Sequence, residues 1–335
     1  MRIAVLGGAG FIGSNFVRYI INNFEEISVL VYDKLTYAGR LENLHGIIES
    51  PRLKFVKGDI CDEDLLERVL REYQPDAIVN FAAETHVDRS INDPSPFLQT
   101  NIFGVFTLLE VSRKLEIGKL IHMSTDEVYG DLFGFESFAD ETWPLNPSSP
   151  YSASKASGDL LIKSYGRTYG LNYILVRPSN NYGPYQHPEK LIPRTLIRFL
   201  HGKPATVYGD GSQVRDWLYV EDTARALYSI LTKGGKQEIY NVCAGEFATI
   251  KEIVAKVVQL MKGDPSRDIV YVKGRPGEDR RYAMRCEKVM GLGWKPLVKL
   301  EEGLMKTIYW YRSNEWWWKP LVDEIYVMSD TPWKS

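Results

Sequence analysis

Hydrophobic and amphipathic segments alternate along the first half of the chain. The hydrophobic segments are short, and several are uninterrupted, as expected of parallel strands that are covered on both faces. They are Arg2–Leu6, Ser28–Tyr32, Leu53–Lys57, Ala77–Phe81, Lys119–Ser124 and Tyr173–Arg177. Segments with helical periodicity lie between them, at Phe11–Asn22, Glu63–Tyr73, Pro96–Leu115 and Ser152–Gly170. The alternation predicts a doubly wound α/β fold with a parallel sheet.

The pattern changes after Arg177 and Pro178. Proline and glycine become frequent and the hydrophobic segments become shorter, which is typical of loop-rich chain. We therefore predict a first domain over residues 1–178 and a smaller C-terminal α/β lobe, for the substrate, over residues 179–335. Residues 220–231 have helical periodicity, and we expect them to pack back on the first domain.

The composition is that of an ordinary globular protein. The chain has 335 residues, of which 44% are hydrophobic and 25% are charged, and its formal net charge is −2. It has no basic stripe, so we do not expect a nucleic-acid partner. No apolar segment approaches the about 20 residues of a membrane span, and the glycine-broken N-terminus is a poor signal peptide. We expect a cytoplasmic protein that does not bind a membrane.

The three cysteines, Cys61, Cys243 and Cys286, are far apart in the sequence and form no C-x-x-C pair. Their spacing predicts neither a disulfide framework nor a zinc site, and it fits a reducing compartment. His86 and His122 do not have the spacing of metal ligands. We therefore expect both histidines to make local hydrogen bonds and expect no metal site.

A glycine-rich segment, VLGGAGFIGS, connects the first predicted strand to the first predicted helix. Gly7, Gly10 and Gly13 would allow a tight turn and a close approach of the backbone to a pyrophosphate at the helix N-terminus. Such a turn alone is a weak signal, but Asp33 ends the second strand, 20 residues after Gly13. An acidic residue there accepts hydrogen bonds from ribose hydroxyls and repels a 2′-phosphate. The segment therefore predicts a Rossmann-type site for NAD rather than NADP, a preference that the neighbouring Lys34 weakens slightly.

The next strand ends should line the same crevice. Asp59 and Ile60 follow the third strand, and Asp59 could contact the adenine. Ala82 and Ala83 follow the fourth strand, where small side chains would let the backbone approach the cofactor. Both segments are explained equally well as ordinary ends of strands that do not contact a cofactor.

The segment YSASK places Tyr151 and Lys155 one helical turn apart. The ordinary pKa of tyrosine is about 10, and a nearby ammonium together with a positive nicotinamide would favour the phenolate. Lowering that pKa by about 3 units requires about 4 kcal/mol of differential interaction. A surface Tyr–Lys pair is the alternative. Together with the glycine motif and the strand end at Ser124–Thr125, the pair predicts alcohol oxidation.

The segment STDEVYG, residues 124–130, places Asp126 and Glu127 side by side where the fifth strand should end. Most aspartates and glutamates are solvated on the surface. The alternative is an acid and a base that act on one substrate.

The segments GGAGFIG, STDEVYG and YSASK together resemble extended short-chain dehydrogenases/reductases that act on nucleotide sugars. YDKLTYAGRLENL, AAETHVDRSI, RPSNNYGPYQHPEKLIP and RPGEDRRYA narrow the resemblance to the dTDP-glucose 4,6-dehydratases, over nearly the whole chain. The family implies tightly held NAD+, dTDP-glucose as substrate, and a homodimer in which Pro96–Leu115 and Ser152–Gly170 of two subunits form a four-helix bundle.

The resemblance also indicates what the two acids would do. An epimerase only oxidises and re-reduces one carbon, whereas a dehydratase must also eliminate water across C5 and C6, which requires a base and an acid with different pKa values. The residues alone do not say which of the two carboxyls is the acid and which is the base. The family implies Asp126 as the acid and Glu127 as the base. It also implies Tyr151 as the base for the C4 hydroxyl, Thr125 as a hydrogen-bond partner of that oxygen, and Lys155 as the residue that holds the cofactor ribose.

The resemblance to the family implies the full set of residues in the cofactor site and in the substrate site. The cofactor site would include Gly7, Gly10, Phe11, Ile12, Gly13, Asp33, Lys34, Leu35, Thr36, Asp59, Ile60, Phe81, Ala82, Ala83, Glu84, Thr100, Tyr151, Lys155 and Asn181. The substrate site would include Thr85, Thr125, Asn180, Lys190, Leu191, Thr206, Val207, Tyr208, Arg215, Asp279, Arg280 and Tyr282. Arg215 and Arg280 offer guanidinium groups for a pyrophosphate, although local ion pairing explains both arginines as well.

Alternatives stay open at this point. Thr206 stands where many family members have proline, and Glu278 stands where they have histidine, which changes the charge near the phosphates. A 4,6-dehydratase, an epimerase or a decarboxylase for a UDP- or GDP-linked sugar is the nearest enzymatic alternative, and an NAD-binding sensor without catalysis is an alternative of another class. The aromatic segment YWYRSNEWWWKPLVDEIY, residues 309–326, is expected to pack in the core or in an interface.

Overall fold

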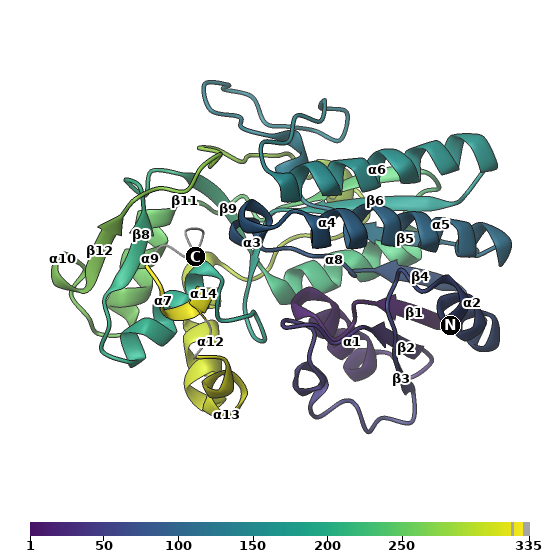
Figure 1. Ribbon diagram of the computed structural model, residues 1–335, viewed down its shortest axis with the longest axis horizontal. Helices are drawn as coiled ribbons and strands as arrows, with labels where there is room; N and C mark the ends of the chain where they lie inside the picture. The colour runs from purple at the N-terminus through teal and green to yellow at the C-terminus, as the bar shows by residue number, and fades with distance from the viewer. Residues whose placement is uncertain (323–324, 331–335) are drawn as a thin grey trace.

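The computed structural model describes residues 1–322 and 325–330. A parallel sheet of seven strands forms its larger part, in the order β10-β6-β5-β4-β1-β2-β3 (Figure 1). The strands are β1 (Arg2–Leu6), β2 (Ser28–Asp33), β3 (Leu53–Lys57), β4 (Ala77–Asn80), β5 (Leu120–Met123), β6 (Tyr173–Pro178) and β10 (Glu238–Val242). The predicted doubly wound α/β fold is confirmed. Because the strand order reverses between β1 and β4, a crevice opens at the carboxyl ends of these strands.

Helices cover both faces of this sheet, because successive residues of each strand point to opposite sides. Ile3 and Val5 of β1 pack in one buried cluster with α1 (Phe11–Asn23) and α8 (Val220–Lys233). The β1 residues between and after them, Ala4 and Leu6, point the other way and belong to a second buried cluster on the other side of the sheet. That cluster contains residues of α2 (Glu63–Tyr73), α5 (Val105–Lys114) and α6 (Pro150–Tyr169). Helix α8 lies against α1, so the segment 220–231 packs on the larger layer, as expected.

The predicted helix Pro96–Leu115 is interrupted. It consists of α4 (Ser95–Leu98), a π-helical segment η2 (Gln99–Gly104) and α5. The π-helical segment contains Asn101, whose amide donates to the Glu84 carbonyl at 3.0 Å and to the Ser154 hydroxyl at 2.8 Å. Widened helical turns of this kind are frequent at functional sites, and this one positions Thr100 beside the cavity described below.

The remaining elements form a smaller lobe to the left in Figure 1. A three-stranded sheet has the order β11-β9-β7, and β12 pairs with β8. Its strands are β7 (Asn180–Tyr182), β8 (Ala205–Tyr208), β9 (Val214–Tyr219), β11 (Phe247–Thr249) and β12 (Ile269–Val272). Its helices are α7 (Leu191–Leu200), α9 (Ile250–Leu260), α10 (Pro265–Asp268), α12 (Leu300–Ser313), α13 (Glu315–Trp318), η4 (Lys319–Leu321) and α14 (Ile325–Met328). Short elements elsewhere are η1 (Leu41–Leu44), α3 (Val87–Asn92), η3 (Asp126–Tyr129) and α11 (Glu287–Met290).

The aromatic segment near the C-terminus contributes to the core of the smaller lobe. Tyr311, Trp317 and Trp318 are buried there with Tyr182 and Trp217, which confirms the prediction of core packing for these side chains. Residues 323–324 of the segment, and 331–335 beyond it, lie outside the described residues.

Cys243 and Cys286 form a disulfide, with Cα atoms 5.9 Å apart, so the prediction of no disulfide is wrong. Cys243 follows β10, and Cys286 precedes α11, which packs against β10. This tertiary packing joins residues 43 positions apart, a proximity that sequence spacing does not reveal. Cys61 is a free thiol.

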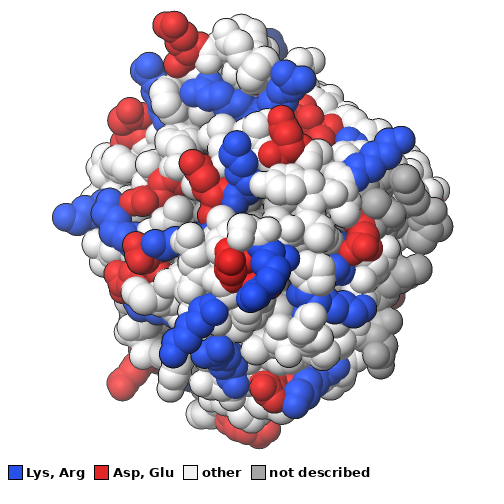
Figure 2. Space-filling view, turned by 90° about the vertical axis from the view of Figure 1, so that its left-hand side faces the viewer, with Lys and Arg blue, Asp and Glu red and all other residues white. Residues whose placement is uncertain are grey.

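Two properties concern the surface and the helices as a whole. No helix within residues 1–322 and 325–330 combines the length and apolarity that crossing a bilayer would require. On the face seen in Figure 2, basic and acidic side chains are interspersed. That face therefore carries no large field of one sign.

Candidate functional site

A cavity of about 290 Å³ lies in the crevice at the carboxyl ends of the parallel strands. It brings together most of the residues predicted for the cofactor, and all five predicted catalytic residues. The predicted residues that line it are Gly7, Gly10, Phe11, Ile12, Gly13, Asp33, Lys34, Thr36, Asp59, Ile60, Phe81, Ala82, Ala83, Glu84, Thr85, Thr100, Thr125, Asp126, Glu127, Tyr151, Lys155, Asn180, Asn181 and Lys190. Leu35 is not among the lining residues.

The glycine turn leaves room for a ligand only because it has no side chains. Gly7 has φ +71, and a Cβ there would lie 2.4 Å from the Ala82 nitrogen. A Cβ on Gly13 would lie 2.3 Å from the Gly7 carbonyl oxygen. Gly10 caps α1, whose first turn has no acidic side chain. Backbone N–H groups at such a helix start attract phosphate, so the turn fits a dinucleotide pyrophosphate.

The end of β2 supplies a fixed carboxylate. Asp33 accepts hydrogen bonds from the backbone N–H groups of Ala9 (2.9 Å) and Leu35 (2.8 Å). Burial raises the pKa of Asp33, while these two backbone bonds lower it. The neighbouring Lys34 pairs with Asp59 at 2.6 Å, so its charge is already engaged. The Asp33 carboxylate therefore suits ribose hydroxyls, in agreement with NAD rather than NADP.

The acid pair lies on η3, the short helix after β5. Thr125 caps this helix, because its hydroxyl accepts from the Glu127 N–H at 3.3 Å. The same hydroxyl donates to Asp126 Oδ1 at 3.2 Å. Glu127 accepts a hydrogen bond from the Ser152 hydroxyl at 3.1 Å. The two carboxyls therefore have different partners although they are adjacent in sequence.

Their environments also differ in charge. Burial and then the Glu127 charge raise the pKa of Asp126 to about 8. Burial also raises the pKa of Glu127, but the positive charges of Arg275 and Arg215 lower it again. A carboxyl with the pKa of Asp126 is mostly protonated at neutral pH. The pair therefore offers a proton donor next to a second carboxyl that lies in a positive field, which suits acid–base elimination.

Tyr151 and Lys155 project from the first turns of α6, which begins at Pro150 after the capping Ser149. Burial raises the pKa of Tyr151 far above its ordinary value, and the Glu127 charge adds to this, whereas the Thr125 hydroxyl lowers it. Lys155 donates to the Met123 carbonyl at 2.7 Å, and burial lowers its pKa to about 8. The chain by itself thus does not acidify Tyr151. A positive group beside the phenol would be needed, and a bound nicotinamide would supply one.

His122 lies behind Lys155. The Asn80 carboxamide oxygen accepts from the Ala82 N–H at 3.0 Å, so its nitrogen must face His122 Nδ1, at 3.0 Å. His122 Nδ1 then accepts, and the ring proton is on Nε2. The expectation of local hydrogen bonding is confirmed for His122. It is also confirmed for His86, which caps α3 by accepting from the Arg89 N–H at 3.4 Å.

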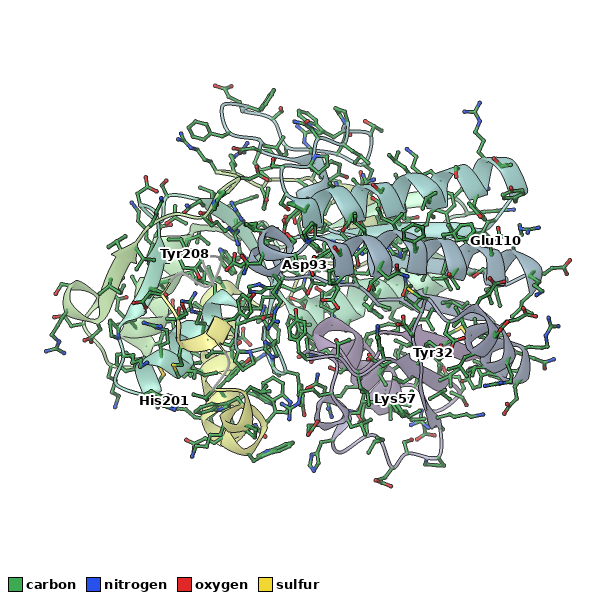
Figure 3. The ribbon with its side chains drawn as sticks, in the orientation of Figure 1. Tyr32, Lys57, Asp93, Glu110, His201 and Tyr208 are labelled. Atoms are coloured by element: carbon green, nitrogen blue, oxygen red, sulfur yellow. A yellow bond between two sulfur atoms is a disulfide. The ribbon has the colours of Figure 1, made fainter. Side chains whose placement is uncertain are left out.

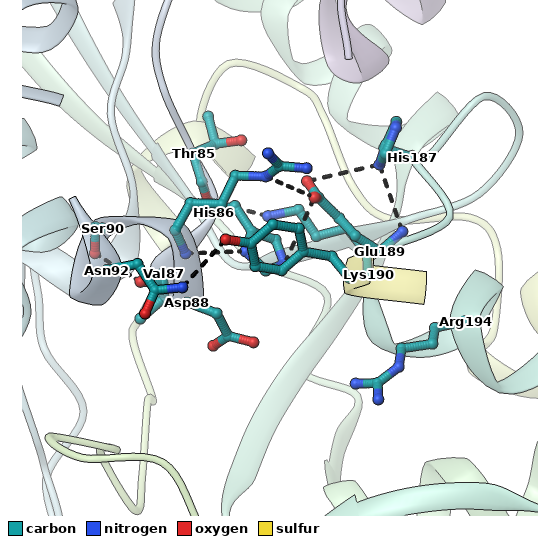
Figure 4. A network of polar contacts seen from close by, with 12 residues as sticks. Thr85, His86, Val87, Asp88, Ser90, Asn92, His187, Glu189, Lys190 and Arg194 are labelled. Carbon is teal, nitrogen blue, oxygen red and sulfur yellow. Dashed lines mark hydrogen bonds and ion pairs between the residues drawn. The ribbon is translucent and has the colours of Figure 1, made fainter. Parts of the chain in front are cut away.

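The far end of the cavity contains the predicted Thr85 and Lys190. Lys190 donates to the Thr85 carbonyl at 3.0 Å, within the polar network of Figure 4. Its neighbour Glu189 is buried and pairs with Arg89 of α3 at 3.1 Å, and the Arg89 guanidinium lies 3.9 Å from the centre of the Tyr37 ring. The contact of Lys190 with the Thr85 carbonyl therefore joins the start of α7 to the loop after β4.

Other predicted substrate residues lie outside this cavity: Leu191, Thr206, Val207, Tyr208, Arg215, Asp279, Arg280 and Tyr282. Figure 3 places Tyr208 in the smaller lobe, away from Tyr32 of β2. Arg215 and Tyr282 still form one cluster, in which the guanidinium lies 4.0 Å from the ring centre. Arg215 donates to the Asp279 carbonyl oxygen at 2.8 Å, and Tyr282 donates to the Asp279 carboxylate at 2.7 Å. Arg280, in contrast, is exposed and lies over Phe133.

Sequence reasoning missed several residues of the site. Tyr37, His187 and Glu189 line the cavity. Arg275 was missed as well, and it pairs with Asp88 at 3.0 Å and with Glu278 at 3.4 Å. The sequence feature that could have identified Arg275 as a site residue was its position in the RPGED segment, which also contains the predicted Asp279. Among the described residues, no group of three or more histidine, cysteine and carboxylate side chains could hold a metal ion.

Comparisons with known proteins show which family and which enzymes this chain resembles. The profile of the protein family described as "GDP-mannose 4,6 dehydratase" matches residues 4–307. The dTDP-glucose 4,6-dehydratase of Neisseria meningitidis is 48% identical over 345 residues, which cover 97% of each chain. The crystal structure of the Bacillus anthracis dTDP-glucose 4,6-dehydratase in complex with NAD has a TM-score of 0.89 and 46% identity, and the match covers 96% of this chain and 99% of that one. The Streptomyces venezuelae enzyme of the same name, also with NAD bound, has a TM-score of 0.92 and 45% identity, over 96% and 100% of the two chains.

Proposed function

The chain belongs to the GDP-mannose 4,6 dehydratase family, and on that premise we propose that it is an NAD-dependent dTDP-glucose 4,6-dehydratase. It converts dTDP-glucose to dTDP-4-keto-6-deoxyglucose and water. The observation that carries this proposal is the Asp126–Glu127 pair, which lines the same cavity as Tyr151 and Lys155. Relatives of that name, 45–48% identical over nearly the full length, support the choice of dTDP-glucose.

NAD would lie on the glycine turn, with its ribose near Asp33 and Lys155. A bound NAD+ would supply a reversible hydride acceptor for C4 and C6, so the cofactor would be regenerated in each turnover and need not leave. The buried walls at Tyr32, Asp33, Tyr151 and Lys155 are consistent with tight retention.

The side chains of this chain perform the proton transfers. Tyr151, as phenolate, takes the proton of the C4 hydroxyl, while Thr125 donates a hydrogen bond to the same oxygen. The C4 ketone makes the C5 proton acidic, and Glu127 removes it. Asp126, whose pKa of about 8 keeps it protonated at neutral pH, gives its proton to the departing C6 oxygen. Glu127 then returns a proton to C5.

The nucleotide part of the substrate would extend from Thr85, Asn180 and Lys190 toward the smaller lobe. The residues proposed to bind it there are Leu191, Thr206, Val207, Tyr208, Arg215, Asp279, Arg280 and Tyr282. Arg215 is buried beside Tyr282, which suits a shielded pyrophosphate contact. Arg280 would have to leave Phe133 to take part.

A homodimer in the cytoplasm is the proposed form of the enzyme. Leu98, Phe103 and Phe106 are 44%, 58% and 45% exposed along α4, η2 and α5, and Leu160 and Tyr169 of α6 are each 56% exposed. Helices α5 and α6 are neighbours, and exposed apolar side chains on both are of the kind found in protein interfaces. Two copies of these helices would form the four-helix bundle, and Phe103→Asp should yield monomers in light scattering.

The first test is incubation of the purified protein with dTDP-glucose, without added cofactor, followed by mass spectrometry of the product. Loss of one water without net reduction of nicotinamide supports the proposal. An unchanged mass with appearance of dTDP-galactose would indicate an epimerase. The family description favours one second candidate, a GDP-mannose 4,6-dehydratase. Water loss from GDP-mannose but not from dTDP-glucose would establish it.

A further inference from the structure

The motif STDEVYG contains a tyrosine that the proposed reaction does not use. Tyr129 is the last residue of η3, the short helix that carries the two acids, and its side chain is buried. Its hydroxyl accepts a hydrogen bond from Arg177 Nη1 at 2.9 Å and donates one to the Asn241 side-chain oxygen at 2.7 Å. The helix of the acid pair is therefore anchored in the core through one hydroxyl group.

Arg177 is at the centre of this buried cluster. Arg177 of β6 and Asn241 of β10 are register partners, which places both side chains on one face of the sheet. The same guanidinium pairs with Asp159, since its Nε and Nη2 atoms each lie 2.9 Å from Asp159 Oδ2. Asp159 belongs to α6, one helical turn after Lys155. One guanidinium thus connects the helix of the acid pair to the helix of Tyr151 and Lys155.

The Arg177–Asp159 pair is enclosed by the core. Its two side chains are 2% and 0% exposed, and the Arg177 guanidinium lies 4.8 Å from the centre of the Tyr129 ring. Separating a buried charge from its partner is strongly destabilising, and closely packed side chains have few alternative positions. The pair is therefore a rigid point of reference against which both helices are held.

The two helices are not equally well anchored by other contacts. Helix α6 has 20 residues, several of which belong to a core cluster. In contrast, η3 has four residues. The neighbouring backbone is held by the Ser124 N–H on the Val176 carbonyl at 2.7 Å and by the Asn146 N–H on the Val128 carbonyl at 3.0 Å. Loss of the Tyr129 hydroxyl should therefore displace η3 and leave α6 in place.

We propose that Tyr129 is a positioning residue for the elimination step, because its contact with the Arg177–Asp159 pair fixes the acid pair relative to Tyr151. C4, C5 and C6 belong to one sugar, so the groups that act on C4 and those that act on C5 and C6 must fit the same bound substrate. A displacement of about 1 Å can cost about 100-fold in rate. The proposal rests on the proposed function and deepens it.

The cluster acts through other residues. Tyr129, Asp159, Arg177 and Asn241 are all absent from the described residues that line the cavity. They would therefore influence the reaction only through the place that they give to the acid pair. An ion pair that merely stabilises the fold would slow C4 oxidation and water loss together, whereas a positioning role affects water loss alone.

Tyr129→Phe tests this difference, because it removes the hydroxyl and keeps the ring. The matched control is Tyr165→Phe, which removes another tyrosine hydrogen bond of α6, the one donated to Glu110 at 2.6 Å. Asp126→Asn provides the reference for blocked elimination. Each protein is purified with its bound NAD and mixed with less than one equivalent of dTDP-glucose. The absorbance of reduced nicotinamide in stopped flow measures C4 oxidation, and quenched mass spectrometry measures the loss of water.

In Tyr129→Phe, reduced nicotinamide should form close to the wild-type rate, while water loss should slow by about 10–100-fold. A sugar nucleotide that has lost two hydrogen atoms but kept its C6 oxygen should then accumulate toward the level seen in Asp126→Asn. Tyr165→Phe should keep both rates. The NAD content of Tyr129→Phe should equal that of wild type, because the cluster is not part of the glycine turn. Equal slowing of both steps, or no change in either, would overturn the proposal.

If Tyr129→Phe does not fold, as judged by urea unfolding, Asn241→Ala decides by the same two rates. This variant keeps the tyrosine and its contact with Arg177 but removes the acceptor of its hydroxyl proton, so the same selective slowing of water loss is expected. Failure of the proposed function has a different signature, since the wild-type protein would then release no water from dTDP-glucose at all.

Discussion

Lys155 Nζ lies 3.4 Å from Nε2 of His122, and both side chains are buried. The Asn80 amide fixes the imidazole tautomer, so that an N–H faces the lysine. Burial lowers the pKa of this lysine to about 8, and the Asp159 charge raises it. The strand residue His122 therefore lies directly beside a residue that the sequence assigned to catalysis.

His122→Phe should lower the free energy of unfolding by about 1–3 kcal/mol. The ring fills the space, but the buried Asn80 amide loses its acceptor. Urea unfolding measures the change. The matched control is His45→Phe on the exposed surface, which should alter stability little. An equal loss in both variants would contradict the role of the buried hydrogen bond.

Gly7→Ala should abolish retention of NAD. Its Cβ would lie 2.4 Å from the Ala82 nitrogen, where the backbone cannot yield. Gly170→Ala is the control, because Gly170 has nearly the same φ, +73, but no atom within 4 Å of the added Cβ. NAD released from heat-denatured protein is quantified by chromatography. Full NAD content in Gly7→Ala would refute the close approach.

Activity should fall as the pH rises through about 8, because Asp126 must be protonated to act as the acid and its pKa is about 8. Its folded pKa exceeds the ordinary 3.8, so the folded state binds the proton more tightly, and this contribution to stability declines from about pH 4 to pH 8. Asp126→Asn should lose about 10²–10⁴-fold in kcat and lose this alkaline limb. The profile of kcat against pH checks both statements. An alkaline limb that persists in Asp126→Asn would belong to another group, such as Lys155.

Exchange at C5 should separate the two carboxyls. In deuterated water, Asp126→Asn should still incorporate deuterium at C5 of bound dTDP-glucose, because Glu127 remains as the base. Glu127→Gln should lose both this exchange and elimination. Mass spectrometry of recovered substrate measures the label. Exchange in Glu127→Gln but not in Asp126→Asn would reverse the two assignments.

Loss of the disulfide should destabilise the folded protein by up to about 4 kcal/mol, the chain-entropy value for a loop of this length. Cys243 and Cys286 are 43 residues apart and buried. The double variant Cys243→Ser, Cys286→Ser should therefore unfold at lower urea concentration than wild type, and dithiothreitol should produce a similar shift after prolonged incubation. Cys61→Ser, which removes the free thiol, is the control. Identical unfolding of all three proteins would show that the bond does not contribute.

Much of the architecture follows from the sequence alone. Uninterrupted apolar segments such as residues 3–6 of β1 are buried on both faces, which only a covered parallel sheet provides. The glycine turn and Asp33 depend on local geometry at one strand–helix junction, so their spacing predicted their positions in the cavity. Tyr151 and Lys155 share one helix face for the same reason.

Only the tertiary structure decided what depends on contacts between distant segments. The Cys243–Cys286 bond, the Asn80–His122–Lys155 chain and the Arg275 pairs with Asp88 and Glu278 each join residues that no periodicity relates. The widened turn at Asn101 depends on Glu84 and Ser154, which belong to other elements. The different pKa values of Asp126 and Glu127 likewise come from burial and from the charges of Arg215 on β9 and of Arg275, which are remote in sequence. Short-range pattern determines which elements form and which side chains share a face, whereas long-range packing determines the electrostatics that make two adjacent carboxyls unequal.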